Sequence, residues 1–107
     1  MDDMLEQPAT GDIDMLEVLK ALADPVRLLI VQNLADTEYV NCSIVSEELE
    51  VHKSTLSHHY KVLRESGVTS TLKNGRGRDI RLRREDLDAR FPGLLSGVLA
   101  GAKTLAP

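Results

Sequence analysis

Apolar residues near the start of the chain recur at intervals of three and four residues, which is the spacing of one helix face. From about Asp12 onward this stripe contains Ile13, Leu16, Leu19, Leu22 and Ala23. Asp24 is a favourable N-cap and Pro25 a favourable first helical residue, so we expect a second helix to begin at once. The residues that this second helix is expected to bury are Val26, Leu29, Ile30 and Leu34.

Two further helices are predicted on either side of a short turn. Ser43 is a candidate N-cap for a helix of about two turns, and Ser54 for a longer helix that runs to Ser66. Gly67 follows as a left-handed terminator. The residues expected to face the core from the shorter helix are Ile44, Val45 and Leu49. Two helices joined by a short turn, here "EVHK", form a helix-turn-helix.

The hydrophobic period changes from about 3.6 to 2 after Gly67, which predicts a β-hairpin. The stretches "VTSTLK" and "RDIRLR" alternate as strands do, and "NGRG" between them predicts a four-residue tip with positive φ angles at Asn74 and Gly75. The inner side of the hairpin is expected to hold Ile80 and Leu82, and the outer side Asp79, Arg81 and Arg83. The basic residues that the tip projects are Arg76 and Arg78.

A last helical pattern lies beyond the hairpin, and Pro92 is expected to divide it into a short and a longer segment. Its apolar residues at helical spacing are Phe91, Leu94, Leu95, Val98, Leu99 and Ala102. Gly93, Gly97 and Gly101 fall four apart, although each glycine inside a helix costs about 1 kcal/mol relative to alanine. Two interpretations stay open: a loose C-terminus, or a small-residue face against which another backbone packs.

These patterns predict one domain that is mainly α with a small β-hairpin wing, in the order α-α-α-α-β-β-α. We expect a flexible acidic tail over residues 1–11, the domain over residues 12–103 and a frayed C-terminus over residues 104–107. With one Phe, two Tyr and no Trp among 107 residues, the core must consist mainly of Leu, Val, Ile and Ala. No apolar run approaches the roughly 20 residues of a membrane helix, and the acidic N-terminus is unlike a signal peptide. We therefore expect a cytoplasmic location without a membrane partner.

The net charge of -4 is distributed very unevenly along the chain. Residues 52–84 carry a balance of +7, and the remainder carries -11. One contiguous third of the chain is thus expected to form a basic surface that a polyanion can approach, while the rest of the molecule repels it.

The stretch "STLSHHYKVLRE" indicates what this basic surface contacts. At about 100° per residue, Leu56, Tyr60 and Leu63 share one helix face, and the opposite face presents hydroxyl, imidazole and ammonium groups. Such groups donate to phosphate oxygens and to purine acceptors in the major groove of double-stranded DNA. The adjacent His58 and His59 diverge around the helix, so they are not expected to share a metal. A solvated helix face without a ligand is the alternative interpretation.

The segments "ALADPVRLLIVQNL" and "SEELEVHKSTLSHHYKVLRESGV" resemble the ArsR/SmtB family of bacterial winged-helix repressors. The likeness covers about residues 13–84, and the "ADPxR" junction and the "SxxSxHxxxLxxxGV" segment occur in the family's order. The resemblance implies a homodimer joined through its first and last helices, with the fourth helix in the major groove and the wing on the DNA backbone or minor groove.

The residues that the resemblance places at DNA are Lys53, Ser54, Thr55, Ser57, His58, Lys61, Arg76 and Arg78. The residues that it places at the dimer interface are Leu16, Leu19, Leu94, Gly97, Val98 and Gly101. His59 matches a frequent histidine of the family, but its face is turned partly inward, so a structural hydrogen bond is at least as well supported as a DNA contact.

The sequence departs from the metal-sensing branches of the family. Cys42 in "VNCSIVSEEL" stands without the second cysteine of a "CxC" pair, and no histidine follows His59. The acids Glu85, Asp86 and Asp88 open a helix, where its dipole explains them. We therefore expect no metal and no cofactor. A further departure is Glu50, at a turn position where glycine is frequent.

Together these observations predict a sequence-specific transcriptional regulator, most simply a repressor that binds an inverted-repeat operator as a homodimer. An effector-responsive or redox-responsive sensor acting through Cys42 or the dimer interface is an alternative, as a lone thiol can be oxidised. A protein-interaction module without DNA binding is another. No catalytic residues are expected, since no nucleophile with a placed base occurs, and enzyme activity is therefore not expected.

Overall fold

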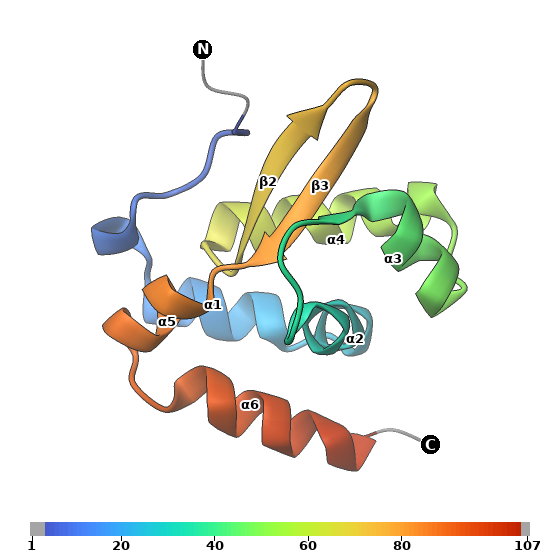
Figure 1. Ribbon diagram of the computed structural model, residues 1–107. Coiled ribbons are helices and arrows are strands. Elements are labelled where there is room, and N and C mark those ends of the chain that lie inside the picture. Colours follow the sequence, from blue (N-terminus) through green and yellow to red (C-terminus); the bar gives the residue numbers. More distant parts are fainter. Residues whose placement is uncertain (1–3, 106–107) are drawn as a thin grey trace.

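The computed structural model describes residues 4–105, which form a small helical domain with a β-hairpin on one side (Figure 1). In chain order the main elements are α1 (Met15–Leu22), α2 (Pro25–Leu34), β1 (Val40–Asn41), α3 (Cys42–Leu49), α4 (Lys53–Ser66), β2 (Thr69–Asn74), β3 (Gly77–Leu82), α5 (Arg84–Arg90) and α6 (Leu94–Ala102). The hairpin of β2 and β3 lies beside α4, and α6 packs on α2 on the opposite side of the molecule. This arrangement confirms the predicted winged helix-turn-helix.

Two of the predicted helix boundaries are confirmed by their capping contacts. The Asp24 carboxylate accepts hydrogen bonds from the backbone N–H groups of Val26 (2.8 Å) and Arg27 (3.1 Å), and Pro25 is the first residue of α2. Gly67 ends α4 with a φ of 88°, which is in the left-handed region.

The predicted caps of α3 and α4 are wrong. Asn41 caps α3 by accepting from the N–H of Ser43, and His52 caps α4 by accepting through Nδ1 from the N–H of Ser54. In both helices the serine expected to cap is the residue whose backbone N–H is capped, because the helix begins one residue before it.

The turn between α3 and α4 comprises residues 50–52 and confirms the helix-turn-helix. Glu50 has a φ of 56°, the conformation that glycine would adopt more easily. The hydroxyl of Ser46 donates to the carbonyl of Val51 and closes the turn.

The core joins the helices to the hairpin, but several apolar positions that were expected inside are exposed. Side chains on the buried faces include Ile13, Val18, Ala21, Leu22, Ile30, Val31, Leu34, Val45, Leu56, Leu63, Val68, Ile80, Leu82, Leu87 and Leu95. The α2 face centres on Ile30, Val31 and Leu34, which turns Leu29 outward with 45% exposure. Val45 of α3 faces the core, so its neighbour Ile44 is 47% exposed.

Helix α1 also departs from the expected single stripe. It buries Val18, Ala21 and Leu22, while Leu16 and Leu19 point outward with exposures of 64% and 41%. The helix therefore has one apolar face toward the core and further apolar side chains on its surface.

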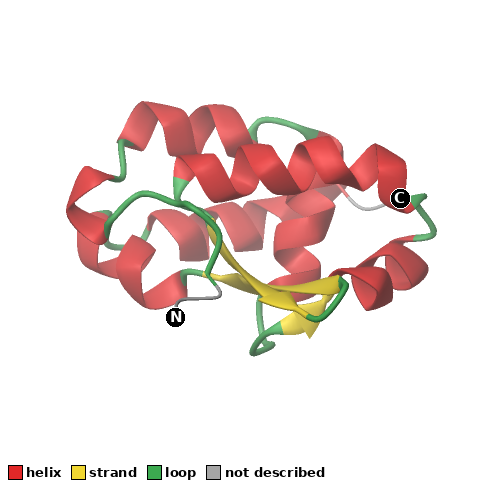
Figure 2. Cartoon of the chain, turned by 90° about the horizontal axis from the view of Figure 1, so that it is seen from above, coloured by secondary structure: helices red, strands yellow, loops and turns green. Residues whose placement is uncertain are grey.

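The sheet contains a strand that the sequence pattern did not predict. In the described part of the chain the strand order is β1-β3-β2, with β1 paired to β3 through Val40 and Ile80. Figure 2 shows the strands in yellow among the helices. Asn74 and Gly77 form the last pair between β2 and β3, so the turn is Gly75–Arg76, two residues rather than the expected four. Gly75 alone of these four residues has a positive φ, of 61°.

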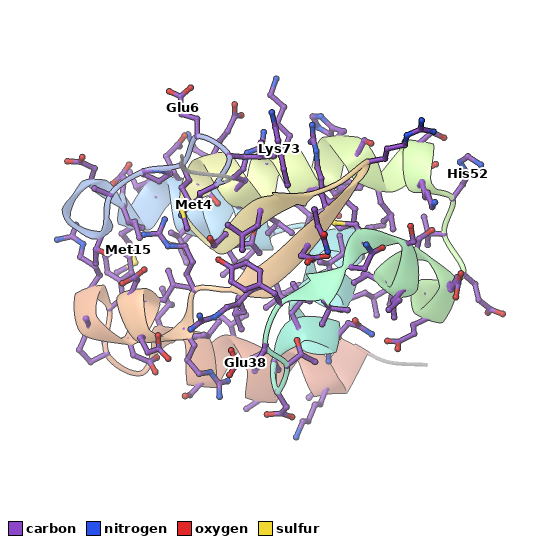
Figure 3. The ribbon with its side chains drawn as sticks, turned by 45° about the horizontal axis from the view of Figure 1, so that its top comes forward. Met4, Glu6, Met15, Glu38, His52 and Lys73 are labelled. Carbon is purple, nitrogen blue, oxygen red and sulfur yellow. The ribbon has the colours of Figure 1, made fainter. Side chains whose placement is uncertain are left out.

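The N-terminal segment lies along the outer edge of β2. Met4 pairs with Leu72, and the N–H of Leu5 donates to the carbonyl of Thr71 at 2.9 Å (Figure 3 labels Met4). From Met4 onward the segment expected to be a flexible tail thus has defined contacts with the sheet; residues 1–3 lie outside the described range. At the other end, a 3-10 turn over Lys103–Leu105 extends α6, and residues 106–107 of the predicted frayed end also lie outside it.

The last helical region is divided as predicted, into α5 and α6 on either side of Pro92. Gly93 precedes α6 with a φ of 85°, so it is not an interior helix residue as expected. Gly97 and Gly101 are inside α6, and open space surrounds the position of a Cβ at each. Among residues 4–105, no helix combines the length and the apolar character that crossing a membrane requires.

Candidate nucleic-acid interface

Helix α4 is fixed in rotation by its buried face. Leu56 and Leu63 are fully buried, and the hydroxyl of Tyr60 donates to the carbonyl of Cys42 at 3.3 Å. The opposite face is consequently turned to solvent, and its exposed residues include Lys53, Ser54, Thr55, Ser57, His58 and Lys61. All six were predicted as DNA contacts, and the structure leaves their side chains accessible.

The two adjacent histidines have different environments. His58 is exposed, whereas His59 is largely covered, and its Nδ1 lies 3.1 Å from Nη1 of Arg27. Because the guanidinium can only donate, Nδ1 accepts, and Asp24 lies 4.0 Å from the same ring atom. Of the two roles left open for His59, the structure shows the structural hydrogen bond.

The carboxyl of Asp24 is part of this same small network. Burial opposes its ionisation, but the backbone N–H and the guanidinium charge of Arg27 outweigh burial and hold the pKa of Asp24 below its ordinary value. The network joins α2 to the middle of α4, through His59.

The hairpin brings a second group of predicted residues to α4. A cleft of about 490 Å³ separates α4 from the wing, and it is lined by Cys42, Ser43, Lys53, Ser57, Tyr60, Lys61, Arg64, Thr71, Arg76, Gly77 and Arg78. Lys53, Ser57 and Lys61 of α4 thus share one cleft with Arg76 and Arg78 of the wing. Ser54, Thr55 and His58 are on the exposed helix outside its lining. Figure 3 shows His52 at the start of α4 and Lys73 on the neighbouring hairpin.

The cations of the cleft are available to an anion. Within residues 4–105 no ion pair involves Lys53, Lys61, Arg64, Arg76 or Arg78. No carboxylate lines the cleft in this part of the chain. The basic surface expected from the charge distribution is therefore concentrated between α4 and the wing.

Two cations counted in the basic segment serve the fold instead. Arg81 lies 3.0 Å from a carboxylate oxygen of Glu85, and Arg83 lies 2.9 Å from one of Asp86. Arg83 was expected on the outer side of the hairpin, but it is only 8% exposed, and it also donates to the carbonyl of Pro8 at 2.7 Å. The basic surface is thus smaller than the residue count indicates.

Cys42 is the first residue of α3, is partly buried and lines the cleft. Burial, reinforced by the nearby charge of Asp79, raises the pKa of its thiol to about 11. At neutral pH the sulfur is therefore almost entirely protonated and a poor nucleophile.

The sequence pattern does not assign several other residues of the cleft to the site, among them Arg64, Tyr60 and Thr71. The charge balance of residues 52–84 includes Arg64 without giving it a role, the helix pattern assigns Tyr60 to the buried face, and Thr71 belongs to the strand pattern "VTSTLK". Arg64 follows Ser57, Tyr60 and Lys61 at helical spacing, which is a signal for a shared face. The position of Thr71 depends on how β2 packs against α4, so no local pattern reveals it.

The residues expected at a dimer interface have mixed exposure in the single chain. Leu16 and Leu19 are exposed, Gly97 and Gly101 are open, and the remaining two, Leu94 and Val98, are half-buried against the core. In the described range, no three or more of the His, Cys, Asp and Glu residues form a group that could hold a metal ion.

A helix-turn-helix whose second helix exposes hydrogen-bond donors, next to a basic hairpin, defines a winged helix-turn-helix protein. Residues 24–71 match the family described as "Bacterial regulatory protein, arsR family". Over 80 residues the chain is 36% identical to the "Uncharacterized HTH-type transcriptional regulator YceK" of Bacillus subtilis (strain 168), which covers 74% of this chain and 80% of that protein. The chain belongs to the arsR family and is a transcriptional regulator, not an enzyme.

Two further similarities agree with this assignment. The chain is 36% identical over 75 residues to the "Arsenical resistance operon repressor" of Staphylococcus xylosus, covering 70% of this chain and 71% of that protein. The crystal structure of the transcriptional repressor BigR from Xylella fastidiosa is similar, with a TM-score of 0.65 and 26% identity over 86% of each chain.

Proposed function

We propose that the protein represses transcription by binding an inverted-repeat operator as a homodimer, with α4 in the major groove and the wing against the DNA backbone. The observation that carries the proposal is the cleft between α4 and the wing, where five cations that form no ion pair within residues 4–105 come together. Two similar proteins that are named as repressors support the direction of regulation.

The proposed contacts divide into those that position the protein and those that read sequence. Lys53, Lys61, Arg76 and Arg78 neutralise phosphates, which supplies affinity for any duplex. The hydroxyls and the imidazole on the exposed face of α4 contact base edges or nearby phosphates; they belong to Ser54, Thr55, Ser57 and His58.

The proposed dimer uses α1 and α6. The exposed Leu16 and Leu19 supply apolar surface, and the open positions at Gly97 and Gly101 allow a close approach of the partner's backbone beside Leu94 and Val98. A two-fold axis would place the two α4 helices about 34 Å apart, one turn of DNA.

The test is selection of bound sequences from a random duplex library, followed by fluorescence anisotropy with the selected operator and with random duplex. We expect Arg76→Ala to weaken both complexes and to reduce the salt slope by about one. His58→Ala should weaken operator binding more than random binding. Lys103→Ala removes an exposed cation at the α6 end and is the matched control, expected to change neither affinity.

The alternatives give different results in the same experiments. A protein-interaction module would bind no duplex even at low salt, and equal effects of all three substitutions would also contradict the proposal. A redox sensor acting at Cys42 would lose operator affinity after peroxide, and Cys42→Ser would not. The raised thiol pKa favours a structural role for this residue instead.

A further inference from the structure

Two residues that line the cleft each have a buried polar atom with no hydrogen-bond partner in the described part of the chain. Within the described residues, the buried side-chain atoms in this condition are Gln7 Oε1, Arg64 Nε, Thr69 Oγ1 and Thr71 Oγ1. Arg64 and Thr71 both line the cleft between α4 and the wing, and Thr71 is only 2% exposed. Because buried polar groups in folded proteins are nearly always hydrogen-bonded, two such donors in residues that line one cleft indicate a missing acceptor.

The local structures explain how these two residues reach the same cleft. Arg64 extends the row of Ser57, Tyr60 and Lys61 along one face of α4, since these positions are three, four and seven residues apart. On β2 the side chains alternate, and Ser70 faces away from α4, where its hydroxyl bonds that of Tyr39 at 2.8 Å. Thr71 is therefore on the opposite face of the strand, toward α4, which packs against β2.

The cleft presents hydrogen-bond donors and positive charges, and within the described residues no carboxylate lines it. Arg64 and Thr71, whose Nε–H and hydroxyl have no partner among the described residues, line it together with two lysines of α4 and two arginines of the wing. Asp79, the carboxylate whose charge acts on Cys42, accepts hydrogen bonds from the side-chain amides of Asn41 (3.5 Å) and Asn74 (3.0 Å). Groups with several acceptor oxygens and a negative charge, such as phosphate, match this set.

We propose that this cleft is a phosphate site, in which Arg64 Nε and the Thr71 hydroxyl donate to oxygens of a single phosphate group. The inference rests on the proposed function in one respect, because the DNA backbone is one source of that group; a free phosphate ion is the other. A phosphate fixed here would set the position of α4 along the duplex without reading sequence.

The hairpin offers a matched pair of substitutions for the test. Thr71→Val and Thr69→Val each replace a buried, unpartnered hydroxyl by a methyl group of similar size on the same strand face. Thr69 does not line the cleft. Both variants should fold and melt like the wild type or slightly above it, since no hydrogen bond is removed within the protein.

For DNA, we expect Thr71→Val to weaken binding about three- to tenfold for operator and random duplex alike, and Thr69→Val to change it less than twofold. Arg64→Lys keeps the charge but lacks Nε, and we expect it to lower DNA affinity by at least as much as Thr71→Val does. Single methylphosphonates placed along the operator then locate the contact. At one backbone position the neutral methylphosphonate should weaken DNA binding by the wild type but not by Thr71→Val.

For the free ion, inorganic phosphate is added to DNA-free protein at constant ionic strength. We expect the NMR signals of the Thr71 amide and the Arg64 Nε–H to shift in the wild type and in Thr69→Val, and not in Thr71→Val. A response to methylphosphonates alone identifies the DNA backbone as the source, and a response to the ion alone identifies a free phosphate.

The proposal is overturned if neither arm responds, or if Thr69→Val and Thr71→Val lose affinity equally, which would indicate a general effect of repacking the strand. Absence of duplex binding by the wild type would refute the proposed function but not the phosphate site, provided that the shifts with inorganic phosphate occur.

Discussion

Replacing Gly67 by alanine tests how α4 is joined to the rest of the fold. Gly67 ends α4 with a φ of 88°, and a Cβ added there would lie 2.7 Å from Cγ1 of Ile13. The other two contacts, at 3.1 and 3.3 Å, are also with the side chain of Ile13, which is 1% exposed. The substitution therefore imposes both backbone strain and overlap with a core residue.

The two costs can be separated by a second glycine. A left-handed conformation costs a residue with a side chain about 1–2 kcal/mol, and forcing extra volume into a packed core adds about 1–3 kcal/mol. We expect Gly67→Ala to lower the free energy of unfolding by the sum, about 2–5 kcal/mol. Gly75 has a φ of 61° and open space around its Cβ position, so Gly75→Ala should cost only the strain.

The assay is urea unfolding followed by circular dichroism at one fixed protein concentration, because a dimer makes apparent stability depend on concentration. Equal losses for the two variants would refute the claim that Ile13 crowds Gly67. If adding Ile13→Val to Gly67→Ala recovers part of the lost stability, the claim is confirmed, since the smaller side chain relieves the overlap.

Three other measurements test separate parts of the structure. Gly97→Ala should strengthen the helix of an isolated chain by about 0.5–1 kcal/mol but weaken the proposed dimer, so light scattering should show dissociation at concentrations where the wild type stays associated; tighter association would contradict the α6 interface. Burial opposes ionisation of Asp86, but hydrogen bonds from Arg83 and Thr10 outweigh it and lower its pKa, so its stabilisation is complete above the ordinary value of 3.8 and is lost as pH falls through the lower folded value. The difference in unfolding free energy between wild type and Asp86→Asn should therefore be constant near neutrality and shrink below about pH 4, whereas a difference that grows in acid would contradict the ion pair. With a pKa of about 11, Cys42 should react with iodoacetamide far more slowly at pH 7 than a free thiol does, with the rate still rising above pH 9.

Features that depend on a few neighbouring residues followed from the sequence alone. Local backbone geometry determines the Asp24-Pro25 junction, the Gly67 terminator and the change to a strand period. Position in the chain determines the clustering of cations after residue 52. The same locality explains the two wrong helix caps, because Asn41 and His52 compete with nearby serines for the same role and only the path of the chain decides between them.

Tertiary packing decided which of several possible faces and partners are used. Leu16, Leu29 and Ile44 fit an apolar helix face, yet the adjoining elements cover a different sector of each helix. The number of charges in the sequence could not show that Arg83 forms an ion pair with Asp86. The two residues belong to a cluster that also includes the N-terminal segment, which only the tertiary structure brings to them.

The candidate site divides in the same way. Its exposed helix and its basic tip could be named from residue types, whereas the cleft that joins them, and the positions of Arg64 and Thr71 within it, could not. The period of a helix or strand predicts the direction in which each side chain points from that element. The distance between side chains of α4 and β2 depends on how the two elements pack, which no period predicts.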